Sequence, residues 1–126
     1  MAEERKQLRL FVSQPMSGRT DEEIFEERWE ALDLVQSARP DRYVTLVESF
    51  LSETPEGVHP PLWYLGASLQ LMAGADMVFM APGWASARGC QLEHMAARKY
   101  GLDVAYHDQF LGAPKNESEE TDSKGE

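Results

Sequence analysis

One segment constrains the fold more than any other: residues 75–101, ADMVFMAPGWASARGCQLEHMAARKYG. It contains a short apolar run, a loop with Pro and Gly, and then a helix-forming stretch. The uninterrupted run MVFMA is typical of a parallel strand that is covered on both faces. In open α/β sheets, ligands bind beyond the carboxyl ends of the strands, where a loop leads from a strand into a helix. Glu93, one or two turns into the expected helix, can therefore face a bound ligand.

The same alternation runs along the rest of the chain. Apolar, β-branched and aromatic runs predict strands over residues 8–13, 43–47, 76–81 and 103–106. Apolar residues at helical spacing predict helices from Thr20 to near Pro40, over residues 62–72, and over residues 86–100. Residues 48–61 read as a loop, and Gly74 and Gly101 are expected to end the second and third helices. Strands that alternate with helices predict an α/β fold with a parallel sheet and right-handed crossovers.

The first helix has the clearest local signals. Thr20 and Glu23 have the spacing of a capping box, in which hydroxyl and carboxylate satisfy amides of the first turn. Its expected apolar face consists of Ile24, Phe25, Trp29, Leu32 and Val35.

Composition narrows the class of protein. A chain of 126 residues is long enough for one domain and too short for two. The net charge of -10 opposes binding to nucleic-acid phosphates. The single cysteine, Cys90, excludes an intrachain disulfide, and neither a signal peptide nor a membrane-spanning run is recognised. We therefore expect a cytoplasmic protein without a nucleic-acid or membrane partner, and a disordered acidic tail over residues 114–126.

Two loops are expected to meet at one edge of the sheet, because they follow the first and third strands. The first contains Gln14, Pro15, Met16, Ser17, Gly18 and Arg19. Its backbone amides, the Ser17 hydroxyl and Arg19 could bind an anion such as a phosphate, although capped helix starts are common in α/β proteins. In the second loop, Trp84 could stack on a planar base or could cover the core.

Glu93 has small neighbours one helical turn away, Gly89 among them, so a ligand could approach that face closely. A carboxylate there would suit attack on the anomeric carbon of a sugar, and a solvated surface glutamate is the competing interpretation. Cys90 and His94 lie four residues apart and form a second candidate, a thiolate and imidazole pair. His59 and His107 lack ligand spacing, so neither a metal nor another cofactor is expected.

The segments FVSQPMSG, ADMVFMAPGW and SARGCQLEHMAARKYG together resemble the nucleoside 2-deoxyribosyltransferase superfamily, particularly its short members of the DUF4406 type. The resemblance covers roughly residues 8–106. It implies a three-layer α/β/α Rossmann-like (flavodoxin-like) sandwich with five parallel strands, one more than the pattern alone places, within a domain over residues 1–113. It also implies a homodimer or larger homo-oligomer in which a neighbouring subunit completes the pocket.

The resemblance further implies an activity on a nucleoside or nucleotide. Glu93 would attack C1' and expel the base, and water or a second base would then take the sugar. The loop from Gln14 to Gly18 would lie by the sugar and the 5' end, and Ser86 would lie near a 5' phosphate. Asp76 matches a strand-start acid for which a structural role and a ligand contact are both open.

Three positions depart from the pattern of the active enzymes. Phe11 stands where a tyrosine usually orients the glutamate, Gln14 where a glycine is usual, and Ser68 where an aspartate acts toward the base. Two further functions therefore stay open beside the glycosidic enzyme. One is a catalytically inactive nucleotide-binding module of the same fold, and the other is a protein-interaction role for the acidic surface.

Overall fold

The computed structural model describes residues 5–47 and 53–110. These residues form four strands, β1 (Lys6–Ser13), β2 (Arg42–Leu46), β3 (Met77–Met80) and β4 (Asp103–Tyr106). The sheet order is β2-β1-β3-β4, and all three pairings are parallel. The expected parallel α/β fold is therefore confirmed, with four strands in the described part of the chain.

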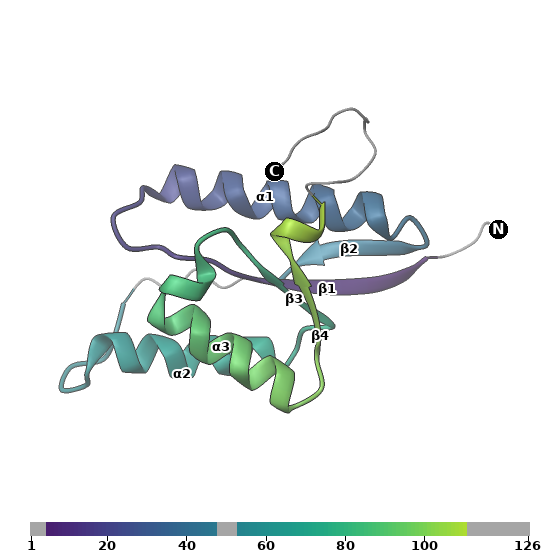
Figure 1. Ribbon diagram of the computed structural model, residues 1–126. Coiled ribbons are helices and arrows are strands. Elements are labelled where there is room, and N and C mark those ends of the chain that lie inside the picture. The colour runs from purple at the N-terminus through teal and green to yellow at the C-terminus, as the bar shows by residue number, and fades with distance from the viewer. Residues whose placement is uncertain (1–4, 48–52, 111–126) are drawn as a thin grey trace.

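The helices cover both faces of this sheet. In Figure 1, α1 (Asp21–Ala38) lies on one side, and α2 (Pro60–Met72) and α3 (Arg88–Lys99) lie on the other. Residues that alternate along β1 divide between the two layers: Leu10 and Val12 pack in the cluster that includes α1, whereas Phe11 packs with Met72 of α2 and Cys90 of α3. This alternation is the period-two pattern of a strand, and it makes the protein a three-layer sandwich.

The start of α1 follows its sequence signal, and its buried face follows the prediction only in part. Thr20 and Glu23 form the reciprocal capping box, with bonds of 3.1 Å and 3.0 Å. The helix buries Ile24, Arg28, Ala31 and Val35. Phe25 and Trp29 are instead 39 % and 58 % exposed, so the prediction of an apolar face through both aromatic residues is wrong. Ile24, Leu32 and Val35 of the predicted face do pack inward, and Arg28 and Ala31 take the buried positions that the prediction gave to the aromatic residues.

Two helix boundaries also differ from the prediction. α2 begins at Pro60, two residues early, because proline is tolerated in the first helical turn. His59 caps this helix through Nδ1, which accepts from the Leu62 amide at 3.4 Å. The helix predicted over residues 86–100 begins two residues late, as α3 at Arg88, because Ala87 is extended and Ser86 ends a separate 3-10 turn, η1 (Trp84–Ser86).

Other boundaries agree to within one or two residues, and β4 agrees fully. Gly101 follows α3 with φ 81°, the left-handed conformation expected after a helix end. The predicted disordered tail over residues 114–126 and part of the predicted loop lie outside the described residues. Within the described residues, no helix has the length and apolar character needed to cross a membrane.

Candidate active site

The first cleft lies at the carboxyl edge of the sheet, beside neighbouring strands β1 and β3. The chain leaves β1 toward β2 on one side and leaves β3 toward β4 on the other, so this is the switch point where α/β folds bind ligands. The cavity measures about 330 Å³, which lies within the usual range for small-molecule sites. It lies between the loop after β1, the start of α3 and α2. Its lining includes Phe11, Gln14, Pro15, Met16, Ser17, Arg28, Tyr64, Ser68, Gly89, Cys90 and Glu93.

Glu93 lies in this cleft and is only 9 % exposed. The Ser13 hydroxyl, at the end of β1, donates to its Oε1 at 2.6 Å. Burial raises the pKa of the Glu93 carboxyl, and hydrogen bonds from Ser13 and Ser68 act in the opposite direction. The solvated-surface interpretation of Glu93 is therefore wrong, because the carboxyl group is buried in a cleft and bonded to the Ser13 hydroxyl of another element.

Cys90 lies beside this carboxylate and does not pair with His94. Burial raises the pKa of the Cys90 thiol to about 11, so the thiol stays protonated at neutral pH. His94 instead bonds through Nε2 to the Tyr106 hydroxyl at 2.7 Å, and its ring centroid lies 4.3 Å from that of Trp84. The thiolate and imidazole pair that the spacing allowed is not formed.

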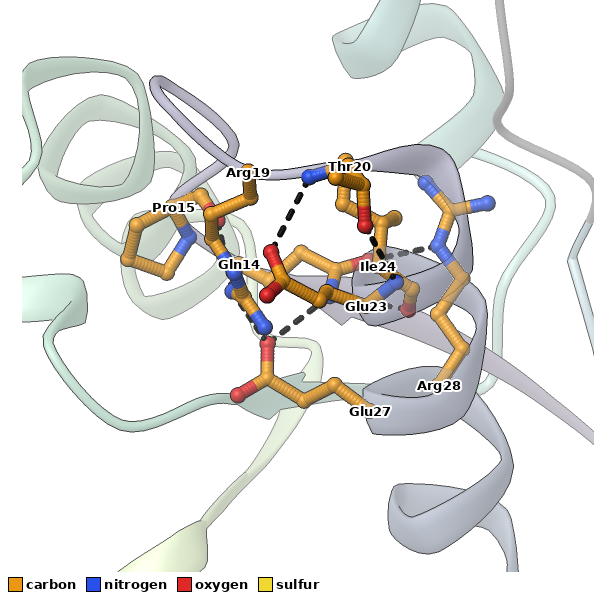
Figure 2. Close-up of polar contacts among 8 residues, drawn as sticks. All are labelled: Gln14, Pro15, Arg19, Thr20, Glu23, Ile24, Glu27 and Arg28. Carbon is orange, nitrogen blue, oxygen red and sulfur yellow. Dashed lines mark hydrogen bonds and ion pairs between the residues drawn. The ribbon is translucent and has the colours of Figure 1, made fainter.

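Gln14 turns toward α1, as Figure 2 shows. Its Nε2 donates to Glu27 Oε1 at 2.8 Å and to the Ile24 carbonyl at 3.3 Å. Its Oε1 accepts from Arg28 Nε at 2.5 Å. The side chain is thus bonded at both its donor and its acceptor, at 5 % exposure.

Arg19 fastens the far end of the same loop. Its guanidinium donates to Glu27 Oε1 and to the Pro15 carbonyl, both at 2.8 Å (Figure 2). Glu27 therefore receives hydrogen bonds from Gln14 and Arg19 together. We call Gln14, Arg19, Glu27 and Arg28 the loop anchor, because their bonds fix the loop after β1 on helix α1.

Two of the remaining residues of the loop after β1, and one glycine of α3, also line the first cleft. Met16 and Ser17 line the cleft, and Met16 is 45 % exposed. Gly18 has φ 77°, which favours glycine at this turn. Gly89 lines the cleft, and a Cβ there would meet nothing within 4 Å, so this side of the cleft is open.

Trp84 and Ser86 line a second cleft of about 620 Å³. This second cleft lies between the loop after β3, the end of β4 and the following 3-10 turn, η2 (His107–Phe110). Neither residue lines the first cleft. The structure thus divides the residues after β3, which the sequence grouped at one site.

Asp76 lies at the other edge of the sheet, just before β3. It accepts from the Arg9 backbone amide at 2.7 Å and forms an ion pair with the Arg9 guanidinium at 3.2 Å. Hydrogen bonds from the Arg9 side chain are the main cause that lowers the pKa of Asp76. Of the two roles left open by the sequence, this contact supports the structural one.

Sequence reasoning missed Ser13, Glu27 and Arg28. Ser13 had one usable signal, since it ends a buried strand and faces the same side as Phe11. Glu27 and Arg28 had none, because charged residues on a helix are usually exposed. The described residues contain no group of three His, Cys, Asp or Glu side chains that could hold a metal ion.

Comparison with known proteins places the chain in a family. Residues 8–106 match the profile of DUF4406, described as a domain of unknown function. The chain belongs to this family. Searches of curated proteins and of solved structures gave no match. Membership in DUF4406 therefore comes with no assigned activity, and the function has to be argued from the site.

Proposed function

We propose that this DUF4406 protein cleaves the N-glycosidic bond of a small nucleoside or nucleoside 5'-monophosphate, with Glu93 as the nucleophile. The observation that carries the proposal is the Glu93 carboxylate, buried in the first cleft and bonded to Ser13 at 2.6 Å. The resemblance of its motifs to the nucleoside 2-deoxyribosyltransferases supplies the substrate class.

The chemistry proceeds in two displacements. An ionised oxygen of Glu93 attacks C1' of the sugar, the bond from C1' to the base nitrogen breaks, and the departing base takes the electron pair and gains a proton. Water or an acceptor base, losing a proton, then attacks C1' and releases the carboxylate. A covalent intermediate of this kind divides one difficult displacement into two easier ones.

The loop after β1 is the proposed contact for the sugar and the 5' end. Met16 and Ser17 line the cleft on that side, and the loop anchor fixes their backbone. A fixed loop favours catalysis because ligand positioning then costs less conformational entropy on binding. By the same resemblance, we propose a homodimer or larger homo-oligomer.

The test is base release by the purified protein. Ribo- and deoxynucleosides and their 5'-monophosphates are incubated with and without an acceptor base, and free and exchanged bases are separated by chromatography. Glu93→Gln should reduce release by roughly 10³-fold or more, as expected for loss of a nucleophile. Glu26→Gln, an exposed glutamate on α1, is the matched control and should behave as the wild type.

The outcome also decides between enzyme and binding module. Phe11 supplies no hydroxyl to the cleft, which favours the module as the second candidate. No release from any substrate, together with calorimetric binding of a nucleotide that survives Glu93→Gln, would establish the binding module and contradict catalysis.

A further inference from the structure

The contact between Ser13 and Glu93 joins two elements that are 80 residues apart in the chain. An ionised carboxylate has only acceptor positions, so the hydroxyl must donate the proton of this bond. The distance of 2.6 Å is typical of a charge-assisted bond between a hydroxyl and a carboxylate. Ser13 is 1 % exposed, so its hydroxyl is shielded from bulk water.

The backbone holds Ser13 in place independently of Glu93. Ser13 is aligned with Met80 of β3, and its carbonyl accepts from the Ala81 amide at 2.9 Å. The hydroxyl therefore projects from the carboxyl end of β1, where the strand is paired with β3. A donor on such a rigid element fixes the direction of its acceptor more closely than a donor on a loop.

Cys90 leaves the proton of Ser13 available to Glu93. The Ser13 hydroxyl interacts with both groups, but the thiol stays protonated because burial raises its pKa to about 11. A protonated thiol is a weak donor, so it can give its own proton to the Ser13 oxygen. A protonated Cys90 thiol therefore does not draw the Ser13 proton away from the carboxylate, to which the hydroxyl bonds at 2.6 Å.

Phe11, two residues before Ser13, brings no hydroxyl to the side of β1 that faces Glu93. Phe11 and Ser13 face the same side of β1, because side chains alternate along a strand. Phe11 packs in the core cluster with Cys90 and has no polar group. The hydroxyl that β1 contributes to Glu93 comes one strand period later, from Ser13.

We propose that Ser13 is a positioning residue for Glu93, whose hydroxyl fixes the orientation of the carboxylate in the first cleft and stabilises its ionised form. The proposal rests on the glycosidic function given above for Glu93. It assigns Ser13 no contact with the substrate, and it makes the end of β1 part of the reacting geometry.

Kinetics give the first test. Ser13→Ala should lower kcat roughly tenfold to hundredfold, because a hydrogen bond to a charged group usually contributes a free energy of that size. KM should change little. The acid limb of the pH profile of kcat should move to higher pH, because loss of the donor raises the pKa of Glu93. Ser13→Thr keeps the hydroxyl and should restore most of the rate. Ser37→Ala, an exposed serine on α1, is the control and should leave both quantities unchanged.

A titration gives the second test and needs no activity. The Glu93 carboxyl is followed by carbon-13 NMR in the free protein and assigned by its absence in Glu93→Gln. Its pKa should be higher in Ser13→Ala than in the wild type. Ser13→Cys, which fills the same space with a poor donor, gives the same comparison if the alanine variant does not fold.

The two tests separate this proposal from the proposed function. A wild-type protein that releases no base would overturn the glycosidic activity. The NMR comparison would still measure how far Ser13 lowers the pKa of Glu93. An unchanged Glu93 pKa in Ser13→Ala, or a pH profile that does not move, would overturn the role of Ser13 even in an active enzyme.

Discussion

The first and second clefts flank the same segment between β3 and α3, and they are built differently. The first cleft contains buried polar groups that bond to one another, with Ser13 on Glu93 and Gln14 on the loop anchor. The second cleft is bordered by the partly buried rings of Trp84 and Tyr106, against which His94 packs. Burial of a polar group is costly unless its hydrogen bonds are made. The first cleft meets that condition and thereby keeps a carboxylate fixed where a ligand can reach it.

The difference between the clefts changes which residues belong to one site. Trp84 and Ser86 are close in sequence to Glu93, but the extended residue Ala87 separates η1 from α3. The two sides of this segment therefore face different cavities. On the sequence alone, Trp84 and Ser86 are assigned to the site of Glu93 because they are close to it in the chain. In the structure, the extended conformation of Ala87 places them at a different cavity.

Among the substitutions that compare how the two clefts are built, Gln14→Ala is expected to have the largest effect. The substitution removes the bonds of Gln14 to Glu27, Arg28 and the Ile24 carbonyl, and should lower the free energy of unfolding by about 1–3 kcal/mol. Urea denaturation measures the change. Gln7→Ala is the matched control, because the exposed Gln7 bonds only at the surface to Thr45, and should cost less than about 0.5 kcal/mol. Equal losses for the two variants would show that the loop anchor adds no stability.

The next prediction concerns which of the two clefts binds the nucleoside. Met16→Ala removes an apolar side chain from the first cleft and should raise KM for the nucleoside roughly fivefold to tenfold. Trp84→Ala alters the second cleft and should leave KM within about twofold, a difference worth well under 1 kcal/mol. Steady-state kinetics on both variants makes the comparison. The reverse order would place the base in the second cleft and would contradict the division made here.

A smaller effect is expected in the pH dependence of stability. Burial raises the pKa of Glu93 above its ordinary value of 4.5, so the folded protein binds this proton more tightly than the unfolded chain. The resulting stability is fully present below pH 4.5 and is lost as the pH rises through the folded pKa.

Glu93→Gln lacks this titration. The stability of the wild type relative to the variant should therefore fall with rising pH, and the variant should be at least as stable at neutral pH. Thermal unfolding from acid to neutral pH measures the difference, with Glu26→Gln as the control. A difference that stays flat across the range would mean that Glu93 is not held in a desolvated state.

The smallest effect is expected at the edge of the sheet away from the first cleft. Asp76→Asn breaks the ion pair with Arg9, but solvent screens this exposed pair, so unfolding at neutral pH should change little. The lowered pKa of Asp76 means that its contribution is present above the unfolded pKa and is lost as the pH falls through the folded one. Thermal unfolding at low and high salt should show the small difference shrinking with salt. A large loss that salt does not reduce would contradict this view of the pair.

Much of the fold follows from local patterns in the sequence. Apolar runs marked all four described strands, the Thr20 and Glu23 pair marked the start of α1, and Gly101 marked the end of α3. These features depend on neighbours within a few residues, so the sequence alone can reveal them. The same reasoning placed Glu93 at the carboxyl edge of the sheet, because strand, loop and helix are consecutive there.

What only the tertiary structure decided is the surroundings of that glutamate. Ser13 reaches Glu93 across 80 residues, Arg28 is buried against a glutamine from the opposite end of a loop, and Trp84 faces another cavity. None of these contacts has a fixed spacing in the chain, because each depends on how a helix rotates and seats against the sheet. The sequence determined that a carboxylate would stand at this edge, and packing between distant elements determined that it would be buried, bonded and held in one orientation.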